Sequence, residues 1–165
     1  FRRGEIEILG LLRLREEQSP TTVRLGRKGH LYDVRGGQYL GLTDTATFDL
    51  THKAAAVLAV LPYEVVGLSL KALPEEMEQG ETISLDAAVV ADCALGDHVL
   101  RIEVFDPSGR LGRAYTANVL ATGGEYRHRL QTALNEQPGR WRAVVTDVIS
   151  GKKAETVFAV TESPQ

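Results

Sequence analysis

Residues 96–109 read GDHVLRIEVFDPSG and carry the two signals that decide the fold. Apolar side chains alternate with polar ones at Leu100, Ile102 and Val104, which is the period of a strand that buries one face. The stretch then ends in Asp106-Pro-Ser-Gly109, where Asp, Pro and Gly occupy the positions that a type I turn prefers. An alternating strand that stops at a turn predicts antiparallel β structure.

The same pattern repeats along the second part of the chain, between further turn signals at Gly123-Gly124, Pro138-Gly139 and Ser150-Gly151. Seven strands are expected, near residues 65–72, 81–91, 97–106, 113–121, 125–133, 139–147 and 153–160. Parity assigns the inward side chains as Ile83, Leu85, Ala87, Val89, Leu100, Ile102, Val104, Trp141, Ala143, Val145, Thr156, Phe158 and Val160. Residues 67–165 are therefore predicted to form a seven-stranded immunoglobulin-like or fibronectin-like β-sandwich without a disulfide.

Residues 1–66 are predicted to form a small antiparallel β domain, with the domain boundary near Val66. The strands are expected near residues 5–15, 21–26, 29–35, 38–43, 46–51 and 55–61. Ala54–Leu61 has helical propensity, but Pro62 follows at once and its Val content suits a buried strand. Arg35-Gly-Gly-Gln38 predicts a two-residue type I′ hairpin, which would set Tyr32 opposite Gly41.

Composition excludes several classes of protein. The 165 residues are 43% hydrophobic and 25% charged, as in an ordinary globular chain, and the net charge is −3. Residues 1–66 hold 9 basic and 8 acidic residues, and residues 67–165 hold 10 and 14, so neither half offers the basic face that a nucleic acid requires. The longest apolar run, Ala54–Pro62, is too short for membrane insertion.

No motif for catalysis, metal or cofactor binding is present. Four scattered histidines show no ligand spacing, and the single Cys93 is expected to fill the core. His98 and His128 are interpreted as hydrogen-bonded structural residues. The glycines fit no dinucleotide or phosphate-binding pattern, and a Gly-x-Ser-x-Gly elbow is absent. We therefore assign no catalytic residue, metal or cofactor.

The hairpin at residues 30–41 holds the candidate binding residues Tyr32, Asp33, Arg35 and Tyr39. Two tyrosine rings could stack on sugar rings while Asp33 or Arg35 holds hydroxyl groups. The alternative is that the rings fill the core or cover a glycine backbone, and that Asp33 and Arg35 form a surface ion pair. Both interpretations remain open from the sequence.

Two further groups of residues have a structural and a binding interpretation. Trp141 could stack on a ligand, but it shares a face with Ala143 and Val145, which favours core packing. Arg101, Arg140 and Arg142, with Glu103 beside them, are expected on an outward sheet face. Ion pairs on a solvated face are preferred there over a patch for an acidic polymer.

Residues 30–41, 61–63, 96–109 and 134–141 together resemble the non-catalytic C-terminal β-domain region of large bacterial β-galactosidase-like glycoside hydrolases. The resemblance covers residues 29–160, and the first 28 residues match no part of it. It implies that the catalytic carboxylates lie upstream, in a catalytic domain of the same chain. The start at Phe1, without Met or signal peptide, is interpreted as that of a piece of a longer protein. Export of such parents implies an extracellular or periplasmic location.

The function expected from these observations is that of a non-catalytic accessory module, structural or for assembly, in a larger carbohydrate-active protein. Tyr63, in the Leu-Pro-Tyr corner, is expected to fix the junction of the two domains. The first alternative is a carbohydrate-binding module for a polysaccharide, using Tyr32 and Tyr39. The second is a protein-interaction module of an extracellular complex, which an unpaired edge strand or an apolar patch would mark. The oligomeric state is not predicted.

Overall fold

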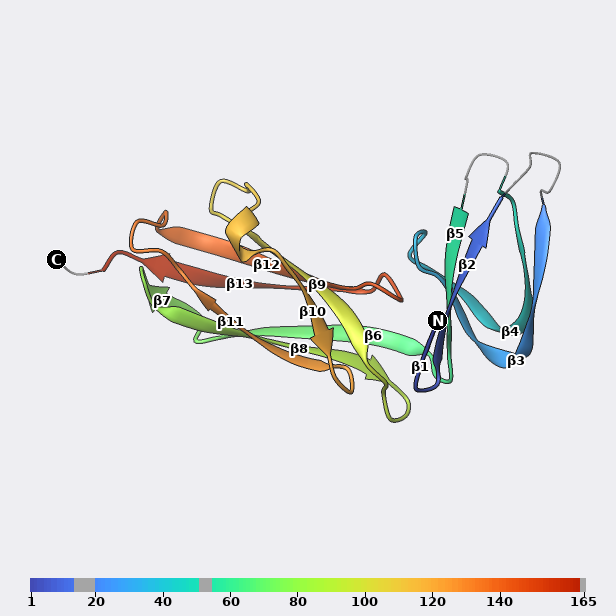
Figure 1. Cartoon of the computed structure of the whole chain (residues 1–165). Helices are drawn as coiled ribbons and strands as arrows, with labels where there is room; N and C mark the ends of the chain where they lie inside the picture. The colour runs from blue at the N-terminus through green and yellow to red at the C-terminus, as the bar shows by residue number, and fades with distance from the viewer. Residues whose placement is uncertain (14–19, 51–54, 164–165) are drawn as a thin grey trace. The chain divides into compact units, whose positions relative to one another are not determined.

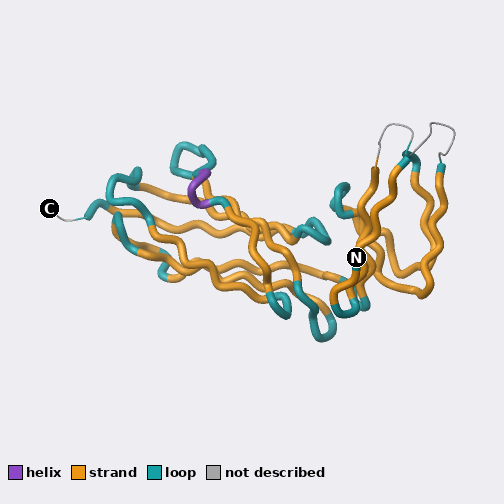
Figure 2. Tube along the Cα trace, viewed as in Figure 1, coloured by secondary structure: helices purple, strands orange, loops and turns teal. Residues whose placement is uncertain are grey.

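Strands account for most of the described chain, which comprises residues 1–13, 20–50 and 55–163 of the computed structural model (Figure 2). Within these ranges the helical structure is one 3₁₀ turn, η2 (Arg113–Tyr115). The predicted all-β class is confirmed. No helix in the described ranges has the length and apolar character needed to cross a membrane. His52 and the ends of the strands expected at 5–15 and 46–51 lie outside the described residues.

The chain forms two compact units. The first comprises Phe1–Val66 together with two short segments from later in the chain, Ala91–Gly96 and Val148–Gly151. The second unit comprises the remaining segments, Gly67–Val90, Asp97–Asp147 and Lys152–Gln165. The sequence does not predict that these two short segments belong to the first unit, because both connect strands of the second unit.

The second unit is a sandwich of two sheets, which Figure 1 shows as two layers. One sheet has the order β10 (Ala117–Ala121), β9 (His98–Phe105), β12 (Gly139–Asp147), β13 (Lys153–Thr161) and β7 (Glu76–Glu78). The other has the order β11 (Glu125–Gln131), β8 (Thr82–Ala91) and β6 (Val65–Leu73). The predicted immunoglobulin-like sandwich is confirmed.

Two details of the predicted strands are wrong. The segment between the strands expected at 65–72 and 81–91 is not a plain connection, because it contains β7, which pairs in parallel with β13. Residues 113–121 were expected to be one strand, but η2 occupies Arg113–Tyr115 and β10 begins at Ala117. Both elements are only three residues long, too short to show a periodic pattern.

The core of the second unit contains the side chains that parity assigned to it. Of the thirteen predicted residues, twelve are buried and Thr156 is half-buried. The ring of Trp141 lies beside those of Phe158 and Tyr115, and its Nε1 donates a hydrogen bond to the carbonyl oxygen of Gln137 at 3.0 Å. The predicted core role of Trp141 is confirmed. Burial of each large apolar side chain stabilises the sandwich by about 1.5–3 kcal/mol.

A buried polar pair joins β9 to β12. The Nδ1 atom of His98 lies 2.8 Å from Oδ1 of Asp147, and both side chains are 0% exposed. His98 is therefore a hydrogen-bonded structural histidine, as predicted. Burial of two such groups is tolerated because each is satisfied by a polar partner.

Turns form at three of the four predicted places, including Ser150-Gly151 between β12 and β13, and not at the fourth. At the end of β9, Asp106 accepts hydrogen bonds from the main-chain N–H groups of Ser108 and Arg110, both at 2.9 Å. Gly123 and Gly124, with φ of 60° and 81°, form the tight turn between β10 and β11. Pro138-Gly139 does not form the expected turn, because the chain turns earlier, where the Glu136 N–H donates to the carbonyl oxygen of Ala133 at 3.3 Å. Gly139 begins β12 instead.

The first unit is one curved antiparallel sheet. Its order is β1 (Arg2–Arg3), β2 (Ile6–Leu12), β5 (Ala55–Leu61), β3 (Thr21–Asp33) and β4 (Gln38–Phe48). The predicted strand at residues 55–61 is confirmed as β5, whereas β3 and β4 each replace two shorter predicted strands. Leu31, Leu58 and Val60 form one buried cluster. Tyr32, the next residue along β3, is buried too. Because adjacent side chains of a strand point to opposite faces, the sheet is covered on both faces at this point.

The register predicted for the β3–β4 hairpin is wrong. Tyr32 lies opposite Tyr39 and Asp33 opposite Gln38, whereas Gly41 pairs with Leu31. The loop is thus four residues long, because the Asp33 carboxylate accepts hydrogen bonds from the N–H groups of Arg35 and Gly36 and extends the turn. A register shift at residues 31–32 adds one residue to β4. Tyr32 therefore does not cover the backbone of Gly41.

The turn at Asp106 predicts a measurable pKa. Hydrogen bonds from the Ser108 hydroxyl, and then from the main chain and side chain of Arg110, lower the pKa of Asp106 to about 2. Since the pKa falls on folding, the carboxylate stabilises the fold above its unfolded pKa, and this contribution is lost as the pH falls through about 2. An NMR titration should show this midpoint, and Ser108→Ala should raise it. A midpoint near ~3.9 in the unchanged protein would contradict the assignment.

The His98–Asp147 pair predicts a large loss of stability when it is broken. Asp147→Ala should lower the free energy of unfolding by about 3 kcal/mol, because His98 loses a buried charged or hydrogen-bonded partner. The double variant His98→Leu, Asp147→Leu should lose less than this. Urea denaturation of the three proteins measures both values, and a single-variant loss below about 1 kcal/mol would contradict the structural role.

Candidate functional site

The candidate hairpin residues Tyr32, Asp33, Arg35 and Tyr39 divide into buried and exposed members. The ring of Tyr32 is 1% exposed, and its hydroxyl oxygen accepts a hydrogen bond from the main-chain N–H of Val65 at 2.8 Å. A ring buried to this extent presents no face to a sugar. Tyr32 is thus a core residue of the first unit, and its polar atom serves the backbone.

Tyr39 is the exposed tyrosine of the hairpin, at 38%. Its hydroxyl lies 2.8 Å from Nδ1 of His30, the two rings are stacked with centroids 5.9 Å apart, and the Tyr32 ring lies 5.0 Å away. Partial burial, and then the nearby carboxylate of Glu64, raise the pKa of Tyr39 above its usual value. The phenol therefore stays neutral at physiological pH and acts as a hydrogen-bonding group.

Asp33 and Arg35 do not form the predicted ion pair. The Asp33 carboxylate is used by the main chain of the turn, at 3.1 Å from the Arg35 N–H and 3.0 Å from the Gly36 N–H. A Cβ atom at Gly36 would come within 2.6 Å of Oδ2 of Asp33, so a larger residue at that position would have to displace the carboxylate. Of the four candidates, only Tyr39 and Arg35 face solvent, and a platform of two tyrosine rings is not formed.

Tyr63 uses its hydroxyl in the same way as Tyr32. The side chain is buried, and its hydroxyl oxygen accepts a hydrogen bond from the main-chain N–H of Gly96 at 2.9 Å. A Cβ atom at Gly96 would lie 3.3 Å from that oxygen and 3.0 Å from Ile6. Two tyrosine hydroxyls thus hold two main-chain amides within the first unit, next to the starts of β6 and β9.

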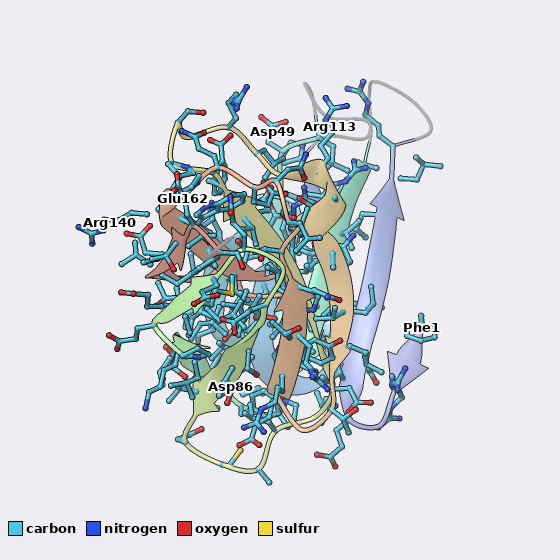
Figure 3. The ribbon with its side chains drawn as sticks, turned by 90° about the vertical axis from the view of Figure 1, so that its left-hand side faces the viewer. Phe1, Asp49, Asp86, Arg113, Arg140 and Glu162 are labelled. Carbon is cyan, nitrogen blue, oxygen red and sulfur yellow. The ribbon has the colours of Figure 1, made fainter. Side chains whose placement is uncertain are left out.

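A polar groove of about 500 Å³ lies on the second unit, on the outward face of β6, β8 and β11. Asp86 and Arg127 face each other across β8 and β11, with N–O distances of 2.7 and 2.8 Å. The hydrogen bond from Arg127 is the main cause that lowers the pKa of Asp86. Figure 3 labels Asp86 on its strand. The sequence could not indicate this pair, because 41 residues separate its members.

Polar side chains besides the Asp86–Arg127 pair also line the groove. They belong to Ser69, Lys71, Glu125 and Tyr126. The Asp86 carboxylate also accepts a hydrogen bond from the Ser84 hydroxyl at 2.9 Å, and the Ser69 hydroxyl donates to the carbonyl of Ala88 at 3.3 Å. A ligand with several hydroxyl groups could share these donors and acceptors.

Three arginines of the five-stranded sheet of the second unit, Arg101, Arg140 and Arg142, lie on its outward face, as predicted. Arg101 pairs with Glu103 at 3.0 Å, and Arg142 pairs with Glu155 at 3.2 Å while its guanidinium lies over the Phe105 ring. Arg140 projects away from the ribbon (Figure 3). These are ion pairs on an exposed face, each contributing little to stability.

No metal centre emerges from the ionisable residues. Within residues 1–13, 20–50 and 55–163, no group of three His, Cys, Asp or Glu side chains is arranged to hold a metal ion. His128 is half-buried, which lowers its pKa. The prediction that Cys93 fills the core is wrong, because its side chain is exposed in the loop of residues 92–97 between β8 and β9.

Comparison with known proteins finds similar folds but assigns the chain to no family. No protein-family model and no curated protein sequence matches the chain. Among solved structures, the native conformation of E. coli α2-macroglobulin is similar over 94% of this chain, with 15% identity and a TM-score of 0.51. The matched part is 11% of the α2-macroglobulin chain. A pair of β units like this one therefore occurs as a small part of a much longer protein.

Shorter matches cover one part of the chain. A β-glucosidase from Listeria innocua in complex with glucose is 20% identical over 59% of this chain and 16% of its own, with a TM-score of 0.36. The CARDB domain of the PF1109 protein from Pyrococcus furiosus, in complex with di-metal ions, is 15% identical over 58% of this chain and 86% of its own, with a TM-score of 0.38. Both scores are too low to support a function, so the resemblance to glycoside hydrolases stays a prediction.

The Tyr63 hydroxyl predicts a local effect on amide exchange. Tyr63→Phe removes the acceptor for the Gly96 N–H, so the hydrogen–deuterium exchange of that amide should become about fivefold faster, equivalent to ~1 kcal/mol. Tyr126→Phe, in the second unit, is the matched control and should leave Gly96 unchanged. Equal exchange of Gly96 in the Tyr63 variant and the unchanged protein would contradict the assigned role.

Proposed function

We propose that this chain is a non-catalytic structural module of a larger, carbohydrate-active protein, with a catalytic domain elsewhere in the same chain as its partner. The observation that carries the proposal is the use of the buried tyrosines. The hydroxyl groups of Tyr32 and Tyr63 bind main-chain amides, so one of the two rings expected to form a sugar platform, that of Tyr32, is used to fix the backbone. An extracellular or periplasmic location belongs to the same proposal.

The recurrence of the fold supports a role as part of a longer chain. The likeness to α2-macroglobulin spans both units and corresponds to a small segment of that protein. Some of the exposed ionisable groups also pair with one another, as in the Asp86–Arg127 and Arg142–Glu155 pairs. Groups paired in this way contribute little to stability and are not poised to transfer protons or attack a substrate.

The second candidate function is carbohydrate binding. The polar groove around Asp86 and Arg127 favours it, because its side chains could bind several hydroxyl groups at once. The exposed ring of Tyr39 offers another point of contact, although its hydroxyl already bonds His30. A carbohydrate could therefore bind at the groove around Asp86 and Arg127 or at the ring of Tyr39.

A glycan array combined with a hydrolysis assay on the same sugars tests the proposal. We expect the folded chain to bind no glycan with a Kd below ~1 mM and to hydrolyse none. Binding that is lost in Tyr39→Ala would assign the hairpin as a carbohydrate site, and binding that is lost in Asp86→Ala would assign the groove. Either result, or hydrolysis by the chain itself, would overturn the structural role.

A further inference from the structure

The outward face of the five-stranded sheet of the second unit carries its charges in rows that cross the strands. Strand pairing sets Arg101 of β9 beside Thr146 of β12, and Thr146 beside Lys153 of β13. The next row along the same strands has a carboxylate on either side of one apolar side chain. Its members are Glu103, Val144 and Glu155. A row with two positive charges thus lies directly beside a row with two negative charges.

Apolar side chains lie on either side of the two charged rows. Next to the positive row, Val99 pairs with Leu120 across β9 and β10, and these side chains are 39% and 43% exposed. Next to the negative row lie Val157, which is 45% exposed, and Phe105, whose ring is covered by the guanidinium of Arg142 at 4.5 Å. Along the strands the order is therefore apolar, positive, negative and mainly apolar.

The carboxylates of the negative row can accept a second cation. Arg101 pairs with Glu103 at 3.0 Å, and Arg142 pairs with Glu155 at 3.2 Å. A carboxylate has about four lone-pair sites, so one arginine does not saturate it. A hollow of about 420 Å³ is lined by both carboxylates. The exposed Lys153, on the same face, forms no ion pair with any residue that the structure describes.

We propose that this face binds the same face of a second copy of the chain, around a two-fold axis that runs between the positive row and the negative row and parallel to both. This axis sets the positive row of each copy over the negative row of the other. Lys153 then faces Glu155 and Arg101 faces Glu103, while Val99 lies over Phe105. Such an interface is isologous, as in most homodimers, and two packed sheets keep their strands nearly aligned.

The order of the charges is the reason for naming a second copy as the partner. A partner must present a negative row and a positive row at the spacing of alternate residues on a strand, which is about 7 Å. The face itself meets this condition once it is turned about the axis. An axis through the middle of either row would instead set like charges over one another, which disfavours that register. The inference goes beyond the proposed structural role, because the partner lies outside the parent chain.

Two charge reversals test the proposal, because they should fail separately and succeed together. Lys153→Glu alone sets two carboxylates over each other at both symmetric contacts, and Glu155→Lys alone sets two ammonium groups there. In a mixture, one copy of each variant restores opposite charges at both contacts, so the variants should form a heterodimer. Circular dichroism checks that each variant folds.

Sedimentation velocity measures the association. Exposed ion pairs each contribute little, so we expect the unchanged chain to dimerise with a dissociation constant on the order of 0.1 mM. Each variant alone should raise that constant at least about tenfold, and the equimolar mixture should return to within about threefold of the unchanged chain. Lys71→Glu, on β6 in the other sheet, is the matched control and should change the constant less than about twofold.

Three results would overturn the proposal. They are a chain that stays monomeric at ~1 mM, a dimer that the single variants do not weaken, and a mixture that associates no better than either variant alone. None of them would alter the outcome of the glycan array, so this proposal and the structural role can fail separately.

Discussion

The hydrogen bonds from two main-chain amides to buried tyrosine hydroxyls are the interactions on which the functional account depends. An aromatic ring can stack on a ligand only where it is exposed, and a phenol oxygen bound to the backbone is not offered to a sugar. Tyr32 and Tyr63 are both buried, and their hydroxyl oxygens accept hydrogen bonds from the main-chain N–H groups of Val65 and Gly96, respectively. These two tyrosines therefore fix the backbone and offer no surface to a ligand.

In both units, most of the polar side chains described above bond the backbone or one another. Asp33 and Asp106 hold turns, the His98–Asp147 pair joins two strands in the interior, and the outward carboxylates pair with arginines. Apolar side chains remain exposed on edge strands of both units, as at Leu42 of β4 and Val66 of β6.

The sequence predicted correctly which face of a strand each side chain occupies, but not which residues of neighbouring strands lie opposite one another. Alternation placed residues such as Ile83 and Val145 in the core, because a strand's side-chain period is a local property. The hairpin register failed because an Asp33 cap and a bulge changed the loop, and neither leaves a periodic signal. The Asp86–Arg127 groove and the exposure of Cys93 depend on contacts between distant segments, which no local pattern encodes.

Nitration of tyrosines, read by mass spectrometry, tests the central claim most directly, because the reagent modifies exposed rings. The account predicts that Tyr39 is nitrated in the folded protein while Tyr32 and Tyr63 react only after unfolding. Modification of Tyr32 in the folded protein, at a rate close to that of Tyr39, would contradict the account. It would mean that both rings of the hairpin face solvent as a binding surface.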